Sequence, residues 1–151
     1  MMRLLAAAIV VVVATAAPIV AGYGFGAADA GEAHGILGPG LVTVHVDIHY
    51  SHFSPSDLRV YDGTLVRFVI TNPDPIHHEF IVGPPSVHAH HEAGHETSHP
   101  PVPGEVSVDP GDTALTTYLF DEPGTVQFAC HLPGHLAYGM QGHVTVLPQS
   151  T

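Results

Sequence analysis

Alternation of apolar and polar residues begins abruptly at Leu41 and continues in short pieces toward the end of the chain. From Leu41 to Ser51, Val, Ile and Tyr occupy every second position, and Thr, His, Asp and Ser stand between them. This period of two is typical of a strand with one face buried and the other in water. It predicts that His45 and His49 lie on the solvent face as ordinary polar residues rather than as metal ligands.

Further short segments of strand-like composition follow, each bounded by Gly, Pro, Asp or Asn. They span residues 64–72, 78–83, 104–108, 113–120, 125–130 and 142–148. No stretch of this region has a convincing helical period. Seven or eight short strands between residues 41 and 148 predict one all-β domain, a β-sandwich.

One segment, residues 86–104, departs from this pattern because it is rich in histidine and has no apolar period. Its five histidines are His88, His90, His91, His95 and His99. The composition predicts a flexible His-rich loop inserted between two strands. Histidine-rich tracts also bind metals, so weak and heterogeneous metal capture is the alternative.

The first thirty residues are predicted to stand apart from the folded domain. A short positive start ending at Arg3 precedes residues 4–22, which carry no charge. This is typical of a signal peptide or an N-terminal membrane anchor, followed by a linker over residues 31–40. Ala28-Asp29-Ala30 offers a small-x-small cleavage pattern, so cleavage and retention both stay open. In either case the domain is exported, either to the periplasm or extracellular space or to the outer face of the cytoplasmic membrane.

The charge of the chain restricts its partners. Three arginines and no lysine stand against fourteen acidic residues, which gives a formal net charge of −11. Such a surface argues against nucleic acid and anionic membrane surfaces as partners, and a basic protein partner suits it better. A monomer is the default expectation.

The single cysteine, Cys130, carries the strongest chemical signal. Exported domains ordinarily use cysteines in disulfide pairs, and this chain has no second one. His135 and Met140 follow Cys130 in the stretch CHLPGHLAYGM. Thiolate and thioether are soft ligands that favour copper, whereas zinc takes thiolate and imidazole but rarely methionine. A blue-copper site has two His, one Cys and a weak axial Met, so one histidine is missing from this loop.

The missing histidine is expected from the strand that begins after the Pro-rich segment NPDPI. Side chains alternate along a strand, so His78 shares a face with Phe80 and Val82, whereas His77 shares its face with Glu79. A buried face accommodates Phe and Val better than a glutamate. The pattern therefore favours His78 as the ligand and leaves His77 as the alternative.

Together, HEFIVG and CHLPGHLAYGM resemble the cupredoxins, the plastocyanin- and azurin-like blue copper proteins. The resemblance covers residues 41–147. It implies a Greek-key β-sandwich holding one type 1 copper ion, Cu(I) or Cu(II), through His78, Cys130, His135 and Met140. In this family one imidazole ligand lies near the surface within an apolar patch, which implies that redox partner proteins dock near His135.

The chain also departs from related patterns. Multicopper oxidases flank the cysteine with two histidines, whereas this chain has Ala129-Cys130-His131 and no room for the further domains of such oxidases. On an extended chain His131 points away from Cys130, so we expect it to face solvent or to form hydrogen bonds. Glu79 stands where many cupredoxins have Asn or Ser. If its backbone N–H bonds to the Cys130 sulfur the side chain matters little, whereas a carboxylate near the metal would lower the reduction potential.

These features predict an exported one-electron carrier working between extracytoplasmic redox partners. No enzyme is expected, because four ligands leave no open position for a substrate. The alternative is a protein of copper delivery, storage or resistance that uses the cupredoxin site and the His-rich segment. A carrier keeps one copper ion while it cycles, whereas a delivery or storage protein binds more than one or releases it readily.

Overall fold

The computed structural model describes residues 35–94, 98 and 100–149. The predicted signal peptide or anchor, residues 1–30, lies outside these residues, as do His95 and His99 of the histidine-rich segment. Within the part of the chain that is described, no helix is long and apolar enough to cross a membrane.

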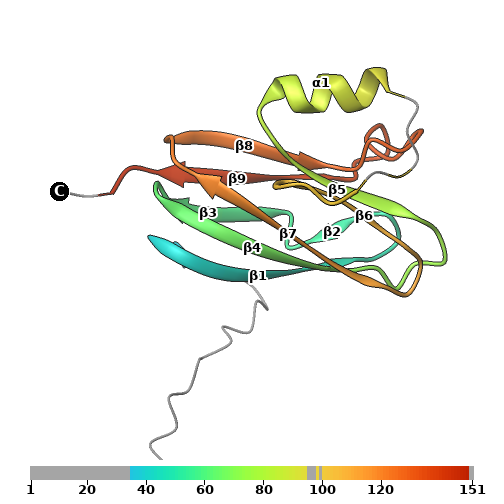
Figure 1. The fold of residues 1–151 in the computed structure, drawn as a ribbon, viewed down its shortest axis with the longest axis horizontal. Coiled ribbons are helices and arrows are strands. Elements are labelled where there is room, and N and C mark those ends of the chain that lie inside the picture. The colour runs from blue at the N-terminus through green and yellow to red at the C-terminus, as the bar shows by residue number, and fades with distance from the viewer. Residues whose placement is uncertain (1–34, 95–97, 99, 150–151) are drawn as a thin grey trace, which may run out of the picture.

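Nine strands of the described residues form two sheets packed face to face (Figure 1). The first sheet has the order β2-β1-β4-β7, with bounds Phe53–Ser54, Gly40–Ile48, Thr64–Thr71 and Thr113–Phe120. The second has the order β3-β9-β8-β5-β6, with bounds Asp57–Tyr61, Gln141–Leu147, Gly124–Ala129, His78–Gly83 and Glu105–Val108. The predicted all-β sandwich is confirmed, and the strand number exceeds seven or eight because β2 and β3 are short pieces of a turn-rich segment.

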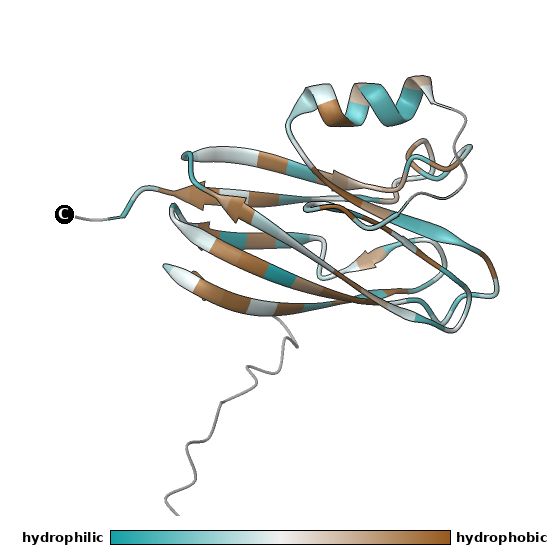
Figure 2. Ribbon diagram, viewed as in Figure 1, coloured by the Kyte–Doolittle hydropathy of each residue, from teal (hydrophilic) through white to brown (hydrophobic). Residues whose placement is uncertain are grey.

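The core lies between the sheets, and the alternating strands supply it. In β1, Val44, Val46 and Ile48 are buried while His45 is exposed, as predicted. The strand ends at Ile48 and not at Ser51, so His49 is exposed just beyond it, and Tyr50, which the alternation placed on the buried face, is 79% exposed. Figure 2 shows the same alternation of apolar and polar positions along the strands. Both inner faces contribute to a cluster of buried aromatic rings, Phe53, Phe68, Phe80, Phe120 and Phe128. Burying each ring stabilises the fold by about 1.5–3 kcal/mol, which gives the strands beneath the ligand loop a rigid base.

Strand β5 is buried on both faces, which corrects one premise of the sequence argument. Glu79 is 1% exposed, so its face is as buried as that of His78 and Phe80. The cause is position: β5 lies between β8 and β6 inside its sheet, and a helix contacts it from outside (Figure 1). Alternation along β5 therefore separates its side chains into two buried sets, not into a buried and a solvated one.

The histidine-rich segment begins with that helix, α1 (Pro85–Ala93), where the sequence predicted a flexible loop. Pro85 stands at its start, where the missing N–H costs nothing, and the Gly94 N–H bonds back to the carbonyls of His90 and His91. The helix lacks an apolar stripe, which is the signal that a periodicity search requires. Its buried residue is a histidine, His88, which is 5% exposed.

Candidate metal centre

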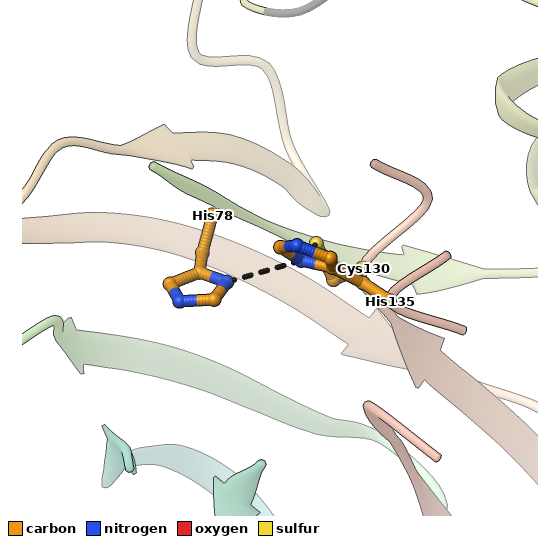
Figure 3. Close-up of side chains that lie close together, drawn as sticks. All are labelled: His78, Cys130 and His135. Atoms are coloured by element: carbon orange, nitrogen blue, oxygen red, sulfur yellow. Dashed lines mark hydrogen bonds between the residues drawn. The ribbon is translucent and has the colours of Figure 1, made fainter. Parts of the chain in front are cut away.

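Three of the four predicted ligands converge at one end of the sandwich. His135 Nδ1 lies 3.3 Å from His78 Nδ1 and 3.2 Å from Cys130 Sγ (Figure 3). All three ligand atoms fit within 4.8 Å of one another. His77 does not join them, because its Nδ1 lies 2.8 Å from Asp109 Oδ1 instead. Of the two candidate histidines, His78 is thus the one that reaches Cys130.

The loop that carries the other ligands is closed by its own backbone. Cys130 directly follows β8 and Met140 directly precedes β9, and these two strands are antiparallel neighbours. The Cys130 N–H donates to the Met140 carbonyl at 3.1 Å, and the Met140 N–H donates to the His135 carbonyl at 3.0 Å. Cys130 and Met140 are both fully buried. Met140 is therefore held beside Cys130 at the base of the loop.

The cysteine sulfur is shielded from water and accepts a backbone hydrogen bond. The Glu79 N–H of β5 donates to Sγ of Cys130, the residue after β8, at 3.4 Å. Burial raises the pKa of the Cys130 thiol to about 11, against the opposing effect of the N–H groups of Glu79 and Leu132. Without a cation the group is a neutral thiol near pH 7, and a bound metal ion would displace its proton.

His78 is oriented by Asp74, a residue that the sequence argument missed. Asp74 Oδ2 lies 3.2 Å from His78 Nε2, and the carboxylate also accepts the N–H groups of Tyr50 and Ser51 at 3.0 and 2.8 Å. Burial opposes ionisation of Asp74, but these N–H groups and His78 lower the pKa of Asp74 overall. Because Nε2 of His78 donates to a carboxylate, the lone pair of Nδ1 faces Cys130 and His135, which is how proteins commonly orient a ligating imidazole.

Both imidazoles of the centre are held neutral. Burial lowers the pKa of His78, and the nearby His135 adds to the effect while Asp74 opposes it. Burial likewise lowers the pKa of His135, with Glu79 and Asp74 acting in the other direction. A neutral imidazole has a free lone pair, so the pair is ready to bind a metal ion near pH 7.

His135 is the ligand nearest to the surface. It is half-buried and lines an open depression of about 470 Å³ together with Leu132, Pro133, His77 and Asp109. The surface beside it is therefore partly apolar and partly polar. The predicted docking of redox partners near His135 stays a prediction.

The sequence predicts that His131 either faces solvent or forms hydrogen bonds. The structure shows that it does not face solvent. Its side chain is 1% exposed and its Nε2 lies 2.8 Å from His88 Nδ1. Burial lowers the pKa of His131 to about 4, with His88 and His91 adding to the effect. The hydrogen-bonding expectation is the one that the structure supports.

The distance between the two imidazole nitrogens can be compared with the distance expected when both bind one metal ion. With metal–nitrogen bonds of about 2.0 Å, two imidazole nitrogens at tetrahedral to trigonal angles lie roughly 3.3–3.5 Å apart. The two Nδ1 atoms of His78 and His135 are 3.3 Å apart. Two imidazoles, a buried thiol and an adjacent thioether are the donor set of a type 1 copper site, so these residues fit copper.

Comparison with known proteins agrees with this geometry. A family model described as copper binding proteins of the plastocyanin/azurin family matches residues 41–147. A copper-resistant cuproprotein, CopI, of Pseudomonas aeruginosa is 30% identical over 171 residues, which cover 86% of this chain and 94% of the relative. CopI of Rubrivivax gelatinosus is 35% identical over 97 residues, covering 62% of this chain and 59% of the relative. Among solved structures, reduced auracyanin from Roseiflexus castenholzii has a similar fold, with a TM-score of 0.59 at 21% identity over 74% of this chain and 98% of that one.

Proposed function

Because the chain belongs to the plastocyanin/azurin family of copper-binding proteins, we propose that it is an exported cupredoxin that protects its cell from excess copper. The observation that carries this proposal is the similarity to three copper-resistant cuproproteins, one of them along most of its length. The sequence alone favours a one-electron carrier and gives copper delivery, storage or resistance as the alternative. The relatives support the second reading better than the first.

In this proposal His78, Cys130, His135 and Met140 would hold the copper ion. The bound ion supplies one-electron chemistry between Cu(I) and Cu(II). The chain's own residues bind and orient: Asp74 fixes the ring of His78, and the closed loop keeps water from the buried Cys130. With all four donors engaged, no position is left open for a substrate, which supports a binding protein rather than an enzyme.

Export of the domain belongs to the same proposal. The uncharged stretch of residues 4–22, preceded by a short positive start, supports it. We place the protein in the periplasm or on the outer face of the cytoplasmic membrane. There it would meet copper before the ion reaches the cytoplasm.

A complementation experiment tests the proposal. A bacterial strain that lacks its own copper-resistance cupredoxin is given this chain, its Cys130→Ser variant or its His77→Ala variant, and growth is measured against copper concentration. The wild type and His77→Ala should restore growth, because His77 bonds to Asp109 outside the centre, whereas Cys130→Ser should not. Equal protection by Cys130→Ser, or none by a correctly exported wild type, would contradict the proposal.

Electron transfer remains a second candidate because of one observation. His135 is half-buried at a partly apolar depression, whereas His78, Cys130 and Met140 are fully enclosed. Cycling the copper-loaded protein with ascorbate and oxidant in the presence of a copper chelator separates the two roles. A carrier should keep its copper through many cycles, whereas a protein that stores or delivers copper should lose it to the chelator.

A further inference from the structure

A second group of imidazoles lies next to the cupredoxin centre. His131, the residue after Cys130, has its Nε2 2.8 Å from Nδ1 of His88 on α1. A third ring, His91 of the same helix, stacks on His131 at a centroid distance of 5.8 Å and an interplanar angle of 20°. We propose that His88 and His131 are the protein ligands of a second copper site, which takes Cu(II) and whose remaining positions are filled by water.

The distance between the two nitrogens suits this ion. With metal–nitrogen bonds of about 2.0 Å, ligands at neighbouring corners of a square-planar site lie about 2.8 Å apart. The separation of His88 Nδ1 and His131 Nε2 is 2.8 Å, shorter than the 3.3 Å between the two imidazoles of the type 1 centre. Square-planar geometry with nitrogen and oxygen ligands is the preference of Cu(II). The two imidazole pairs of this chain thus match two different copper geometries.

His88 has the support that a ligating histidine needs. Its Nε2 lies 3.2 Å from the Gln127 carbonyl oxygen, so this nitrogen carries the proton and donates it. The lone pair of Nδ1 is then directed at His131. His78 has the same arrangement in the type 1 centre, with Asp74 in place of the carbonyl. In both cases an acceptor behind the ring fixes the tautomer and aims the other nitrogen.

A change of tautomer would allow His131 to bind a metal ion through Nε2. Since His88 Nδ1 can only accept, Nε2 of His131 donates the hydrogen bond between the rings. Nδ1 of His131 is then a buried acceptor with no hydrogen-bond partner among the described residues. When a copper ion takes the lone pair of Nε2, the ring proton moves to Nδ1, whose nearest carboxylate oxygen is Oε1 of Glu92 at 4.0 Å. The metal-bound tautomer would carry an N–H at Nδ1, 4.0 Å from the Glu92 carboxylate, which is beyond hydrogen-bond distance but favourable for electrostatic attraction.

Charge and access also suit a cation. Glu92 lies 4.0 Å from His131, and Glu105 Oε2 is held 2.9 Å from His91 Nε2, so two carboxylates lie beside this group of rings. His88 also lines a cleft of about 400 Å³ whose wall includes Asp121 and Glu122 of the β7–β8 turn. The acidic cleft offers a copper ion a path from solvent to the buried ring of His88.

This site goes beyond the type 1 centre and does not depend on the proposed role in resistance. It would double the copper capacity of the folded domain, and His131 would join the two ions through its peptide bond to Cys130. His131, which the sequence predicts to face solvent or to form hydrogen bonds, and His88 of α1, in a segment that the sequence predicts to be a loop, together form the site.

Copper stoichiometry and electron paramagnetic resonance of the purified full chain test the proposal. Wild type should bind at least two Cu(II) ions, one of them with a type 1 signal and another with a tetragonal signal split by nitrogen. His88→Gln should lose one equivalent and the tetragonal signal while it keeps the type 1 colour. His90→Gln is the matched control, because His90 is exposed on the same helix and should keep both.

Two further experiments distinguish failure of the second copper site from failure of the type 1 assignment. In Cys130→Ser the tetragonal signal should persist, so a failure of the type 1 assignment does not count against the second site. Copper-edge anomalous scattering from crystals of the copper-loaded wild type should give a peak between His88 Nδ1 and His131 Nε2, which requires no variant to fold. A wild type with no tetragonal signal, a His88→Gln protein that keeps it, or a map without this peak would overturn the proposal.

Discussion

Two proposed copper ligands of the type 1 centre, His78 and Cys130, are each held by a residue that does not itself supply a ligand atom. Asp74 fixes the ring of His78, and the Glu79 N–H points at Cys130 Sγ. Asp74 is in turn held by two N–H groups of the turn after β1, where Tyr50 and Ser51 adopt positive φ values of 50° and 57°. Non-glycine residues rarely adopt this conformation, so the turn stores strain that the carboxylate offsets.

Replacing Asp74 tests this support. Asp74→Asn keeps the size of the side chain but removes the charge and one acceptor, so the His78 ring loses its fixed orientation. Copper affinity of the type 1 centre should fall about 10–100-fold, measured by competition with a copper chelator. Asp109→Asn is the matched control, because Asp109 pairs with His77 outside the centre and its loss should leave affinity unchanged. Wild-type affinity in Asp74→Asn would contradict the role given to Asp74.

Glu79 should influence the reduction potential through its charge. Its backbone N–H bonds to Cys130, while its carboxylate is buried and acts electrostatically on both Cys130 and His135. A negative group near copper favours Cu(II) over Cu(I), so Glu79→Gln should raise the potential measured by voltammetry. Glu122→Gln, a change at an exposed residue, is the control. An unchanged or lower potential in Glu79→Gln would contradict this view.

At the scale of elements, the ligand loop depends on glycines with positive φ. Gly139 has a φ of 93° and leads directly into Met140, and a Cβ added there would meet no atom within 4 Å. Any penalty of a side chain at this position therefore comes from the backbone conformation and not from crowding.

Gly139→Ala should lower the free energy of unfolding by about 1–3 kcal/mol, because alanine is strained at this φ. Denaturation of the copper-free protein by urea measures the change. Gly35→Ala is the matched control, because Gly35 also has open space around it but no positive φ. Equal stability of the two variants would show that the loop can relax around Gly139.

The elements that the sequence predicts are those whose side chains alternate. Strand β1 follows its alternating pattern as far as Ile48, although not to the predicted end at Ser51, and β5 begins and ends where predicted, at His78 and Gly83. Helix α1 lacks such a pattern, because it is anchored by the buried polar ring of His88 and not by an apolar stripe. The helical structure of that segment depends on tertiary contacts, which a local sequence pattern does not reveal.

In the candidate centre, too, the sequence predicts some residues and does not reveal others. Cys130, His135 and Met140 are close in sequence, so their spacing alone suggested a common site. His78 could be selected from two neighbours by strand phase, although both faces of β5 are buried. Asp74 is only four residues from His78, but the N–H groups that hold its carboxylate belong to residues 23 and 24 positions away. His88 lies 43 positions from His131, so no local pattern reveals that pairing.

At the scale of the whole molecule, the copper-free fold encloses several imidazoles in their neutral form. Burial lowers the pKa of His131 to about 4 and also lowers the pKa of His78 and His88 from the ordinary value of 6.5. In the unfolded chain these groups titrate near 6.5, so below that pH the unfolded state binds more protons than the folded one.

Titration of these histidines should therefore leave the free energy of unfolding of the copper-free protein independent of pH above pH 6.5. This free energy should fall progressively as the pH drops from 6.5 toward 4. Urea denaturation at several pH values measures this dependence, and His131→Gln should make it shallower. A copper-free protein that is equally or more stable at pH 5 would contradict the account of its buried histidines.

The central claim is that one copper ion is bound through the thiolate of Cys130. Visible absorption during a Cu(II) titration of the purified wild type and of Cys130→Ser tests it most directly. An intense blue or green band, which arises from charge transfer between thiolate and copper, should saturate at one equivalent in the wild type. It should be absent from Cys130→Ser, whatever copper that variant takes up elsewhere. Only a weak, pale band, equal in both proteins, would show that Cys130 is not a ligand and would contradict the account.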